Sequence, residues 1–308
     1  MTVFSRRALI KMVGYTAGAS LLSPLLSFRD PSAMMQRAIP STGEKLPVVG
    51  LGSWLQFDVG SAASERAPLK EVLIRMNQMG GRMIDSSPMY GRAEEVIGDL
   101  TTETGVADHF FYATKVWTTG REAGIAQMES SFRKMRRKTM DLMQVHNLTD
   151  YDTHLKTLNT WKKEGRIRYT GATHYAVSAH AALERLAKAR AVDFLQFNYS
   201  IRVRNAEKSL LNAAMDNGIA VVINEPFDSG SLFGLVKGKQ LPGWASDYAI
   251  KSWAQFFLKY ILSHPAVTCV IPGTSDPVHL ADNMGAGHGT LPDEKGREKM
   301  RQLMEQLS

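Results

Sequence analysis

The chain has 308 residues, of which 44% are hydrophobic, and a formal net charge of +7 at pH 7. This composition predicts a soluble globular protein with a sizeable core, and it argues against disorder, a collagen-like fibre and a membrane-spanning bundle. The lone cysteine, Cys269, excludes a disulfide framework, the eight histidines show no metal-ligand spacing, and the scattered charge argues against nucleic-acid binding.

Residues 1–33 have the composition of an export signal. Arg6 and Arg7 precede a mildly apolar stretch, residues 12–26, that small and polar residues interrupt. The arginine pair resembles the twin-arginine pattern, which implies transport of the folded protein by the twin-arginine export machinery to the bacterial periplasm. The alternatives are an amphipathic N-terminal helix and an uncleaved signal that anchors the protein to a membrane.

Beyond residue 33, short β-rich runs alternate with longer helical patterns in eight strand-helix units. The predicted strands cover residues 48–51, 82–86, 110–116, 142–146, 169–173, 194–199, 219–224 and 267–272. The helices that follow them cover residues 68–79, 94–100, 123–137, 154–164, 179–189, 207–217, 248–262 and 277–284, and a last helix covers 293–307. Gly80, Gly165 and Gly218 stand where left-handed helix caps are expected.

Eight such units without a Pro-rich or Ser-rich linker predict an α/β fold, a single-domain (β/α)8 TIM barrel over residues 34–308. A doubly wound open sheet is the competing architecture. Its first strand-helix turn needs a glycine fingerprint that this chain does not have. In a barrel, the chemistry lies at the carboxyl ends of the strands.

Four proton-handling residues stand at or just beyond consecutive strand ends: Asp85, Tyr90, Lys115 and His146. Taken singly, each is explained by a loop cap, a rim aromatic, a surface lysine or a core histidine. These separate explanations leave a lysine and an aspartate inside apolar strands, where an unpaired charge costs several kcal/mol. An ion pair between Asp85 and Lys115 removes this difficulty.

The same four residues suit carbonyl reduction. Tyr90, with an ordinary pKa of about 10, is protonated near neutrality and can donate a proton. We expect Lys115 to lower that pKa by stabilising the phenolate, with Asp85 keeping the lysine charged and in place. Neutral His146 would donate a hydrogen bond that orients the carbonyl oxygen.

These residues occur within segments that resemble the aldo-keto reductases. The matching segments are 81–87, 89–91 with Glu94, Glu95 and Gly98, 113–115, 141–146, 163–168 leading into 171–173, and 271–274 with Asp282 and Asn283. Any one motif arises easily by chance, whereas the ordered set runs from about residue 50 to 283 and is specific.

The resemblance implies a barrel reductase that binds a nicotinamide dinucleotide and transfers hydride to an aldehyde or ketone through the Asp85, Tyr90, Lys115 and His146 tetrad. By position, it implies that the cofactor is bound by Thr173, His174, Gln196, Asn224, Glu225, Pro226, Phe227, Gly273, Thr274, Ser275, His279, Asp282 and Asn283. The implied substrate walls are Trp54, Trp117 and Asn147, for which packing at the barrel rim is the alternative.

The chain departs from many members of that family at three cofactor positions. His174 stands where Asn is common, and Gly273 and His279 stand where Lys and Arg recognise the 2′-phosphate of NADPH. The Thr274 and Ser275 hydroxyls, backbone amides and, when it is protonated, His279 remain for that phosphate. NADP(H) is therefore the first expectation and NAD(H) the second.

Two other functional classes stay open at this stage: a cofactor-binding regulatory protein of the same fold with little turnover, and a barrel lyase or isomerase. The loop from residue 227 to 245, rich in Gly and Ser, is expected to act as a lid and specificity element over the pocket, and a merely mobile connection is the alternative. The sequence predicts neither the physiological carbonyl substrate nor the oligomeric state.

Overall fold

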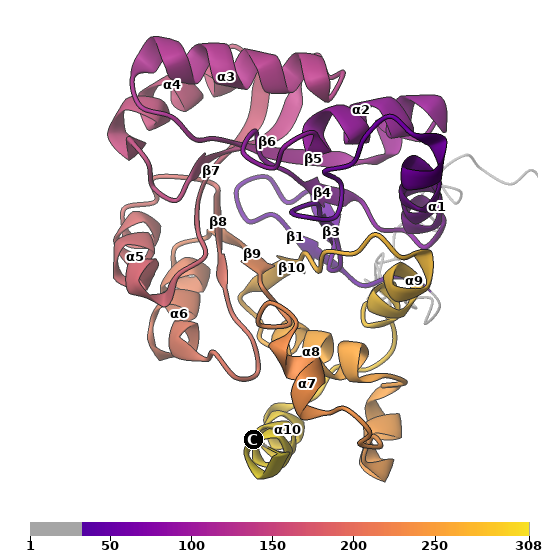
Figure 1. Cartoon of the computed structure of the whole chain (residues 1–308). Coiled ribbons are helices and arrows are strands. Elements are labelled where there is room, and N and C mark those ends of the chain that lie inside the picture. Colours follow the sequence, from indigo (N-terminus) through magenta and orange to yellow (C-terminus); the bar gives the residue numbers. More distant parts are fainter. Residues whose placement is uncertain (1–32, 308) are drawn as a thin grey trace, which may run out of the picture. The chain divides into compact units, whose positions relative to one another are not determined.

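The computed structural model describes residues 33–307, in which eight parallel strands form a ring with helices around it (Figure 1). The strands are β3 (Leu51–Gly52), β4 (Met83–Asp85), β5 (Phe111–Val116), β6 (Met140–His146), β7 (Ile167–His174), β8 (Phe194–Asn198), β9 (Ala220–Asn224) and β10 (Val267–Val270). The helices between and after them are α1 (Ala63–Gln78), α2 (Ala93–Glu103), α3 (Arg121–Lys134), α4 (Tyr151–Lys163), α5 (His180–Lys188), α6 (Leu210–Asp216), α7 (Ser231–Leu235), α8 (Trp253–Leu262), α9 (Pro277–Gly285) and α10 (Glu294–Leu307).

The ring closes between its first and last strands. Single parallel bridges join Val49 to Val270 and Gly52 to Gly273. The backbone N–H of Gly50 donates to the Val270 carbonyl at 2.8 Å, and the Val270 N–H donates to the Val48 carbonyl at 2.9 Å. The predicted (β/α)8 barrel is therefore confirmed, and its strands have partners on both sides.

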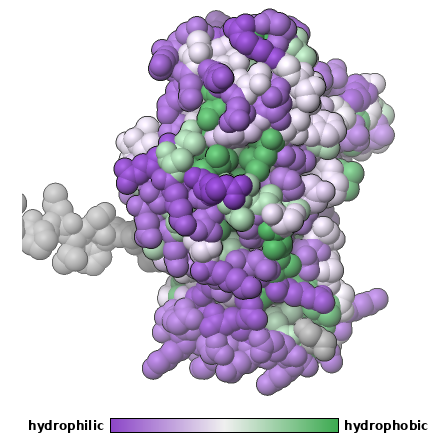
Figure 2. Space-filling model, turned by 90° about the vertical axis from the view of Figure 1, so that its left-hand side faces the viewer, coloured by the Kyte–Doolittle hydropathy of each residue, from purple (hydrophilic) through white to green (hydrophobic). Residues whose placement is uncertain are grey.

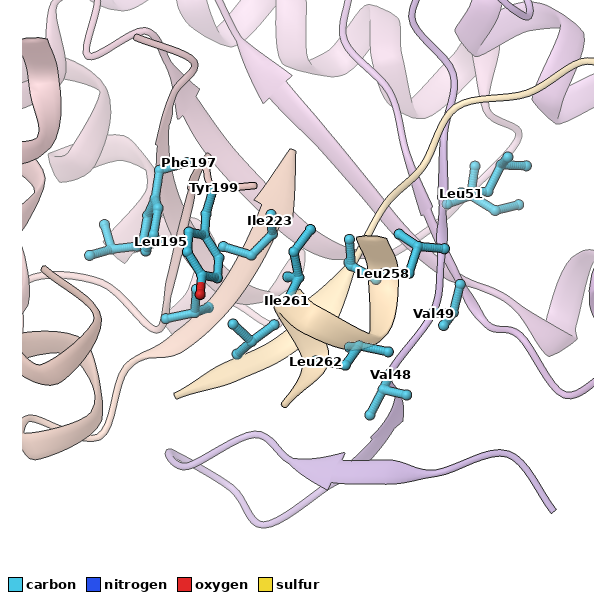
Figure 3. Close-up of a cluster of buried hydrophobic side chains, with 14 of the residues drawn as sticks. Val48, Val49, Leu51, Leu195, Phe197, Tyr199, Ile223, Leu258, Ile261 and Leu262 are labelled. Atoms are coloured by element: carbon cyan, nitrogen blue, oxygen red, sulfur yellow. The ribbon is translucent and has the colours of Figure 1, made fainter. Parts of the chain in front are cut away.

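Side chains alternate between the inside and the outside of the barrel, as the strand period of two requires. The inward positions of the strands form one buried apolar cluster, which extends at Ile271 to the pocket lining: Met83, Phe111, Ala113, Leu142, Tyr169, Phe194, Ala220, Val222, Cys269 and Ile271, together with Ile39 and Leu46. The outward positions pack against the helices. Figure 3 shows part of that layer, in which Val49 and Ile223 gather with Leu258 and Ile261 of α8.

A short hairpin, β1 (Gln36–Ala38) and β2 (Lys45–Pro47), covers the amino-terminal end of the barrel. Its buried side chains Ile39 and Leu46 belong to the interior cluster, and the Thr42 hydroxyl lies 2.7 Å from the Tyr169 hydroxyl. The sequence pattern predicts no element here. Strands of three residues are too short to show a period of two, so only the turn composition around Gly43 marks the hairpin.

Three helix predictions need correction. Helix α1 begins at Ala63, five residues before the predicted start, with Pro68 inside it. The helix predicted over 207–217 is a 3-10 turn (Asn205–Lys208) followed by the shorter α6. The one predicted over 248–262 begins at Trp253, because Ala249 is left-handed with φ +53° and ends a separate 3-10 turn.

The left-handed caps expected after three helices are present. Gly80, Gly165 and Gly218 have φ values of +80°, +72° and +69°. A side chain at any of them would strain the backbone, because L-residues rarely adopt this region. The prediction of these helix ends is confirmed.

The predicted export signal lies outside the described residues except for residue 33, and the boundary between residues 33 and 34 stays a prediction. Within residues 33–307, no helix has the length and apolar character needed to cross a bilayer. Figure 2 shows one flank of the molecule, where hydrophilic residues cover most of the surface and hydrophobic ones gather in small patches at mid-height. This distribution is typical of amphipathic helices around a barrel.

Candidate active site

The inward positions change from apolar to polar toward the carboxyl ends of the strands. On β5, Lys115 follows Phe111 and Ala113 on the inward face, and on β6, Gln144 and His146 follow Leu142. These polar side chains underlie a pocket of about 700 Å³ at this end of the barrel. The pocket is thus placed where barrel enzymes have their catalytic groups.

A buried ion pair forms the floor of the site. Lys115 Nζ lies 2.6 Å from Asp85 Oδ2 and donates to the Ser86 carbonyl at 2.7 Å. Lys115 is 0% exposed and Asp85 3% exposed, so both charged groups are buried. Burial lowers the pKa of Lys115, but the attraction of Asp85 and of Tyr90 outweighs it and raises that pKa above the usual value. The lysine is therefore a permanent cation.

Two glutamines complete the coordination of the aspartate. Gln144 Nε2 and Gln196 Nε2 donate to Asp85 Oδ1 at 3.1 and 2.8 Å. The Thr173 hydroxyl in turn donates to Gln196 Oε1 at 3.0 Å. Breaking a buried pair of this kind by removing one partner typically costs about 3–5 kcal/mol. The network fixes the carboxylate, and the carboxylate fixes the lysine.

Tyr90 stands beside the cation. Lys115 Nζ lies 5.0 Å from the centre of the Tyr90 ring, and the tyrosine lines the pocket. Burial raises the pKa of Tyr90 above 10, while Lys115 lowers it and Asp85 raises it. Lys115 therefore lowers the pKa of Tyr90 as expected, but burial of the phenol outweighs this effect, so the net pKa is raised. The phenol stays protonated throughout the physiological range.

His146 is neutral. Burial first, and then the charges of Lys115 and His174, lower its pKa to about 2. Its Nδ1 lies 3.0 Å from the Ser87 hydroxyl oxygen, which also accepts the Met89 backbone N–H at 3.4 Å. The Ser87 hydroxyl can donate to Nδ1. In that arrangement the ring proton resides on Nε2, where the ring can serve as a donor in the pocket.

The residues expected to bind the cofactor divide into two groups. Those that line the pocket are Thr173, Gln196, Asn224, Glu225, Pro226, Phe227 and Gly273. Those outside its lining are His174, Thr274, Ser275, His279, Asp282 and Asn283. Asn224 Oδ1 is buried and has no hydrogen-bond partner among the described residues. A buried acceptor of this kind is costly unless a ligand supplies a donor.

Several residues of the second group already have protein partners. His174 Nδ1 accepts the Ala176 N–H at 3.0 Å. Asp282 Oδ1 accepts from Gln255 at 2.8 Å, and His279 lies 3.9 Å from Asp276, whose carboxylate caps the first turn of α9. This end of the site therefore carries acidic side chains beside its histidine.

The three expected substrate residues differ in position. Trp54 and Asn147 line the pocket, whereas Trp117 lies outside its lining, with its ring centre 6.4 Å from that of His146. Asn147 is left-handed, with φ +52°, and its Oδ1 is buried without a partner in the described chain. The strained turn holds this amide beside His146.

Sequence reasoning missed Ser87 and Gln144. Both lie inside segments that were recognised, next to residues that were selected for their chemistry. The strand period contained a signal for Gln144, since it stands two residues before His146 and so shares its face. Ser87 gives no such signal, because its contact with His146 spans 59 residues. No three His, Cys, Asp or Glu side chains of residues 33–307 are placed to hold a metal ion.

With this geometry in place, comparisons with known proteins identify the family. The model of the Aldo/keto reductase family matches residues 48–299. The chain belongs to this family. It is 27% identical over 259 residues to methylglyoxal reductase YeaE of Escherichia coli (strain K12), covering 81% of this chain and 89% of the relative. It is 24% identical to the NADH-specific methylglyoxal reductase of the same strain, covering 89% and 99%.

Solved structures of aldo/keto reductases share the fold. An enzyme from Klebsiella pneumoniae, in complex with NADP and acetate, superposes with a TM-score of 0.72 at 24% identity. The match covers 85% of this chain and 93% of the other. The assignment of the barrel is thus independent of the motifs from which the sequence analysis began.

Replacement of Ser87 by Ala tests the proton placement on His146. In the wild type we expect the ¹⁵N spectrum of His146 to show a neutral ring with the proton on Nε2 from pH 4 to pH 9, since its pKa is about 2. The S87A ring should stay neutral but populate both tautomers. Titration of the wild-type ring near pH 6.5, or an unchanged tautomer ratio in S87A, would contradict this assignment.

Proposed function

We propose that this protein reduces an aldehyde or ketone to an alcohol, with NADPH or NADH as hydride donor and Tyr90 as proton donor. The observation that carries the proposal is the buried Lys115–Asp85 pair, whose ammonium lies 5.0 Å from the centre of the Tyr90 ring at the base of the pocket. A cation held in this way favours the tyrosinate that remains after proton transfer. The names of the curated relatives support the reaction class.

The residues present fit a nicotinamide dinucleotide. When bound, this group supplies the hydride. The unpaired Asn224 Oδ1 offers an acceptor for the carboxamide N–H, and Thr173, His174 and Gln196 on β7 and β8 would hold the same amide. The turn 224–227 would flank the cofactor, and Gly273, Thr274, Ser275, His279, Asp282 and Asn283 would meet its adenosine end.

The protein's own side chains then transfer one proton to the substrate. The carbonyl oxygen accepts hydrogen bonds from Tyr90 Oη and His146 Nε2, which polarises the carbon that receives the hydride. As the carbon–oxygen double bond becomes single, the oxygen takes the Tyr90 proton and the electron pair of that O–H bond stays on the phenolate. Lys115 stabilises this anion, and Asp85 keeps Lys115 in place. Solvent restores the proton to Tyr90 after product release.

We propose NADPH as the first cofactor and NADH as the second. Hydroxyls and amides of residues 273–275 serve the 2′-phosphate in the first case. The second is favoured by the Asp276 carboxylate, which lies 3.9 Å from His279 and repels a phosphate there. The ratio of the Kd values for the two nucleotides, measured by quenching of tryptophan fluorescence, distinguishes them.

Replacement of Tyr90 by Phe tests the proton donor. We expect kcat for carbonyl reduction to fall by about 10²- to 10⁴-fold, because general acid catalysis contributes that much, while the Kd for nucleotide stays unchanged. Stopped-flow absorbance of the nucleotide at 340 nm measures the first quantity and fluorescence titration the second. Full turnover in Y90F would reject Tyr90 as the donor, and nucleotide binding without turnover of any carbonyl by the wild type would favour a regulatory protein.

We further propose that residues 1–33 direct the folded protein, with its cofactor already bound, through the twin-arginine export machinery to the periplasm. The proposal rests on Arg6, Arg7 and the apolar stretch that follows. Replacing both arginines by lysine keeps the charge and should retain the protein in the bacterial cytoplasm, as cell fractionation would measure. Undiminished export of the double variant, or an exported protein free of nucleotide, would contradict the respective part of the proposal.

A further inference from the structure

The loop that carries Tyr90 joins β4 to α2 and covers residues 86–92. Within it, the Tyr90 N–H donates to the Ser87 carbonyl at 3.0 Å, and the Tyr90 carbonyl accepts the Ala93 N–H at 3.1 Å. The next residue, Gly91, is left-handed, with φ +59°. Since Tyr90 is next to this turn, the conformation of the turn determines where the phenol points.

Residues 53–60, which follow β3, bond to both ends of this loop, and we call them the bracing segment. At its start, the Ser53 N–H and hydroxyl donate to the Asp85 carbonyl at 3.0 and 2.9 Å, and Ser53 is fully buried. Near its end, Asp58 Oδ1 accepts the Arg92 N–H at 2.9 Å. The bracing segment thus holds the loop where it leaves β4 and where it enters α2.

The bracing segment is itself anchored on both sides of Asp58. Phe57, directly before it, is fully buried in the hydrophobic core. Beyond it, Arg66 of α1 donates to the Gly60 carbonyl at 2.8 Å and lies 2.8 Å from the Asp99 carboxylate of α2. The backbone of Asp58 is therefore restricted, although its side chain is exposed to solvent.

The carboxyl group of Asp58 packs directly on Gly91. A Cβ atom at position 91 would overlap the carbon and both oxygens of that carboxyl group, so only glycine fits while Asp58 keeps this position. The left-handed φ of Gly91 favours glycine for a second reason, which lies in the backbone. The contact therefore fixes the chain one residue beyond Tyr90.

The same carboxylate caps helix α2. Arg92 is the N-cap residue of this helix, and its own side chain makes no capping hydrogen bond. A carboxylate at the start of a helix is favoured by the unpaired N–H groups and by the helix dipole. Asp58 provides such a carboxylate from a segment 34 residues earlier in the chain and so joins the start of α2 to the bracing segment.

We propose that Asp58 is a positioning residue for Tyr90. Its carboxylate holds the backbone just beyond Tyr90 and so keeps the phenol beside Lys115. The catalytic consequence of this role rests on the proposed carbonyl reduction. Without the carboxylate, the turn at Gly91 loses a contact and the Arg92 N–H loses its acceptor, so the phenol occupies more than one position. A displacement of about 1 Å in a reacting group can lower the rate about 100-fold.

Replacement of Asp58 by Ala tests this role. We expect kcat for carbonyl reduction to fall by about 10- to 100-fold in D58A. The Kd for nucleotide should stay unchanged, because Asp58 lies outside the pocket lining. D58N keeps an oxygen acceptor in a side chain of the same shape, so it should recover most of the lost kcat. An unchanged kcat in D58A, or an equal loss in D58A and D58N, would overturn the proposal.

Asp293→Ala is the matched control. Asp293 is also exposed, and its Oδ1 accepts the Gly296 N–H at 2.8 Å at the start of α10. It is therefore another aspartate that caps a helix, but it has no contact with the loop of Tyr90. Its kcat should equal that of the wild type, and a loss as large as in D58A would show that the effect is not specific to the bracing segment.

A double-mutant cycle tests the contact between Asp58 and Gly91. Gly91→Ala should lower kcat, because the added methyl group meets the Asp58 carboxyl group and because alanine is strained at this φ. In the D58A background the first cause is removed, so the same replacement should lower kcat by a severalfold smaller factor. Equal factors in the two backgrounds would contradict the proposed contact.

An NMR measurement separates failure of this inference from failure of the proposed function. With ¹³C at the ring carbon that bears the hydroxyl, the Tyr90 resonance of D58A should be broadened or split, because the ring occupies more than one position. The resonance of Tyr169, at the amino-terminal end of the barrel, should be unchanged. This result without carbonyl turnover by the wild type would reject the reductase and keep the positioning role. Turnover by the wild type with an unaltered Tyr90 resonance in D58A would keep the reductase and reject the positioning role.

Discussion

The structure of the site depends on one buried charge pair, Lys115 with Asp85. Both side chains are withdrawn from water inside the barrel, and each would be strongly destabilising without the other. Their orientation is imposed by Gln144 and Gln196, which occupy the remaining oxygen of the carboxylate. The ammonium of the pair lies 5.0 Å from the centre of the Tyr90 ring, and the proposed chemistry depends on this local charge.

The barrel explains why this pair can exist. Below it, the inward positions of the strands are filled by apolar side chains such as Phe111, Leu142 and Phe194, and the β1–β2 hairpin covers the far end. Water has no path to the charges from that side. At the other end, the exposed side chains of Trp54, Leu55 and Tyr175 line the opening. A single polar layer thus lies between an apolar interior and an apolar rim, which strengthens every electrostatic interaction within it.

The sequence predicted the features that depend on local pattern and on the strand period. These include the eight strand-helix units, the glycine caps at Gly80, Gly165 and Gly218, and the convergence of Asp85, Lys115 and His146. The sequence could not predict quantities that depend on how far a side chain is buried. The pKa of Tyr90 is raised because the effect of burial outweighs that of the nearby ammonium. The spacing of residues in the sequence does not show which of these two effects is larger. The start of α8 likewise depends on one left-handed residue, Ala249, and an alanine does not lead one to expect a left-handed conformation.

The central claim is that Lys115 acts on Tyr90 electrostatically, and the pKa of the phenol measures this directly. Tyrosine labelled with ¹³C at the ring carbon bearing the hydroxyl reports each titration by NMR. In Lys115→Met, the account predicts that the pKa of Tyr90 rises above its wild-type value, because the cation that lowers it is gone, while the resonance of Tyr112, outside the barrel against Arg137, is unchanged. The same Tyr90 pKa in a folded variant and in the wild type would contradict the account.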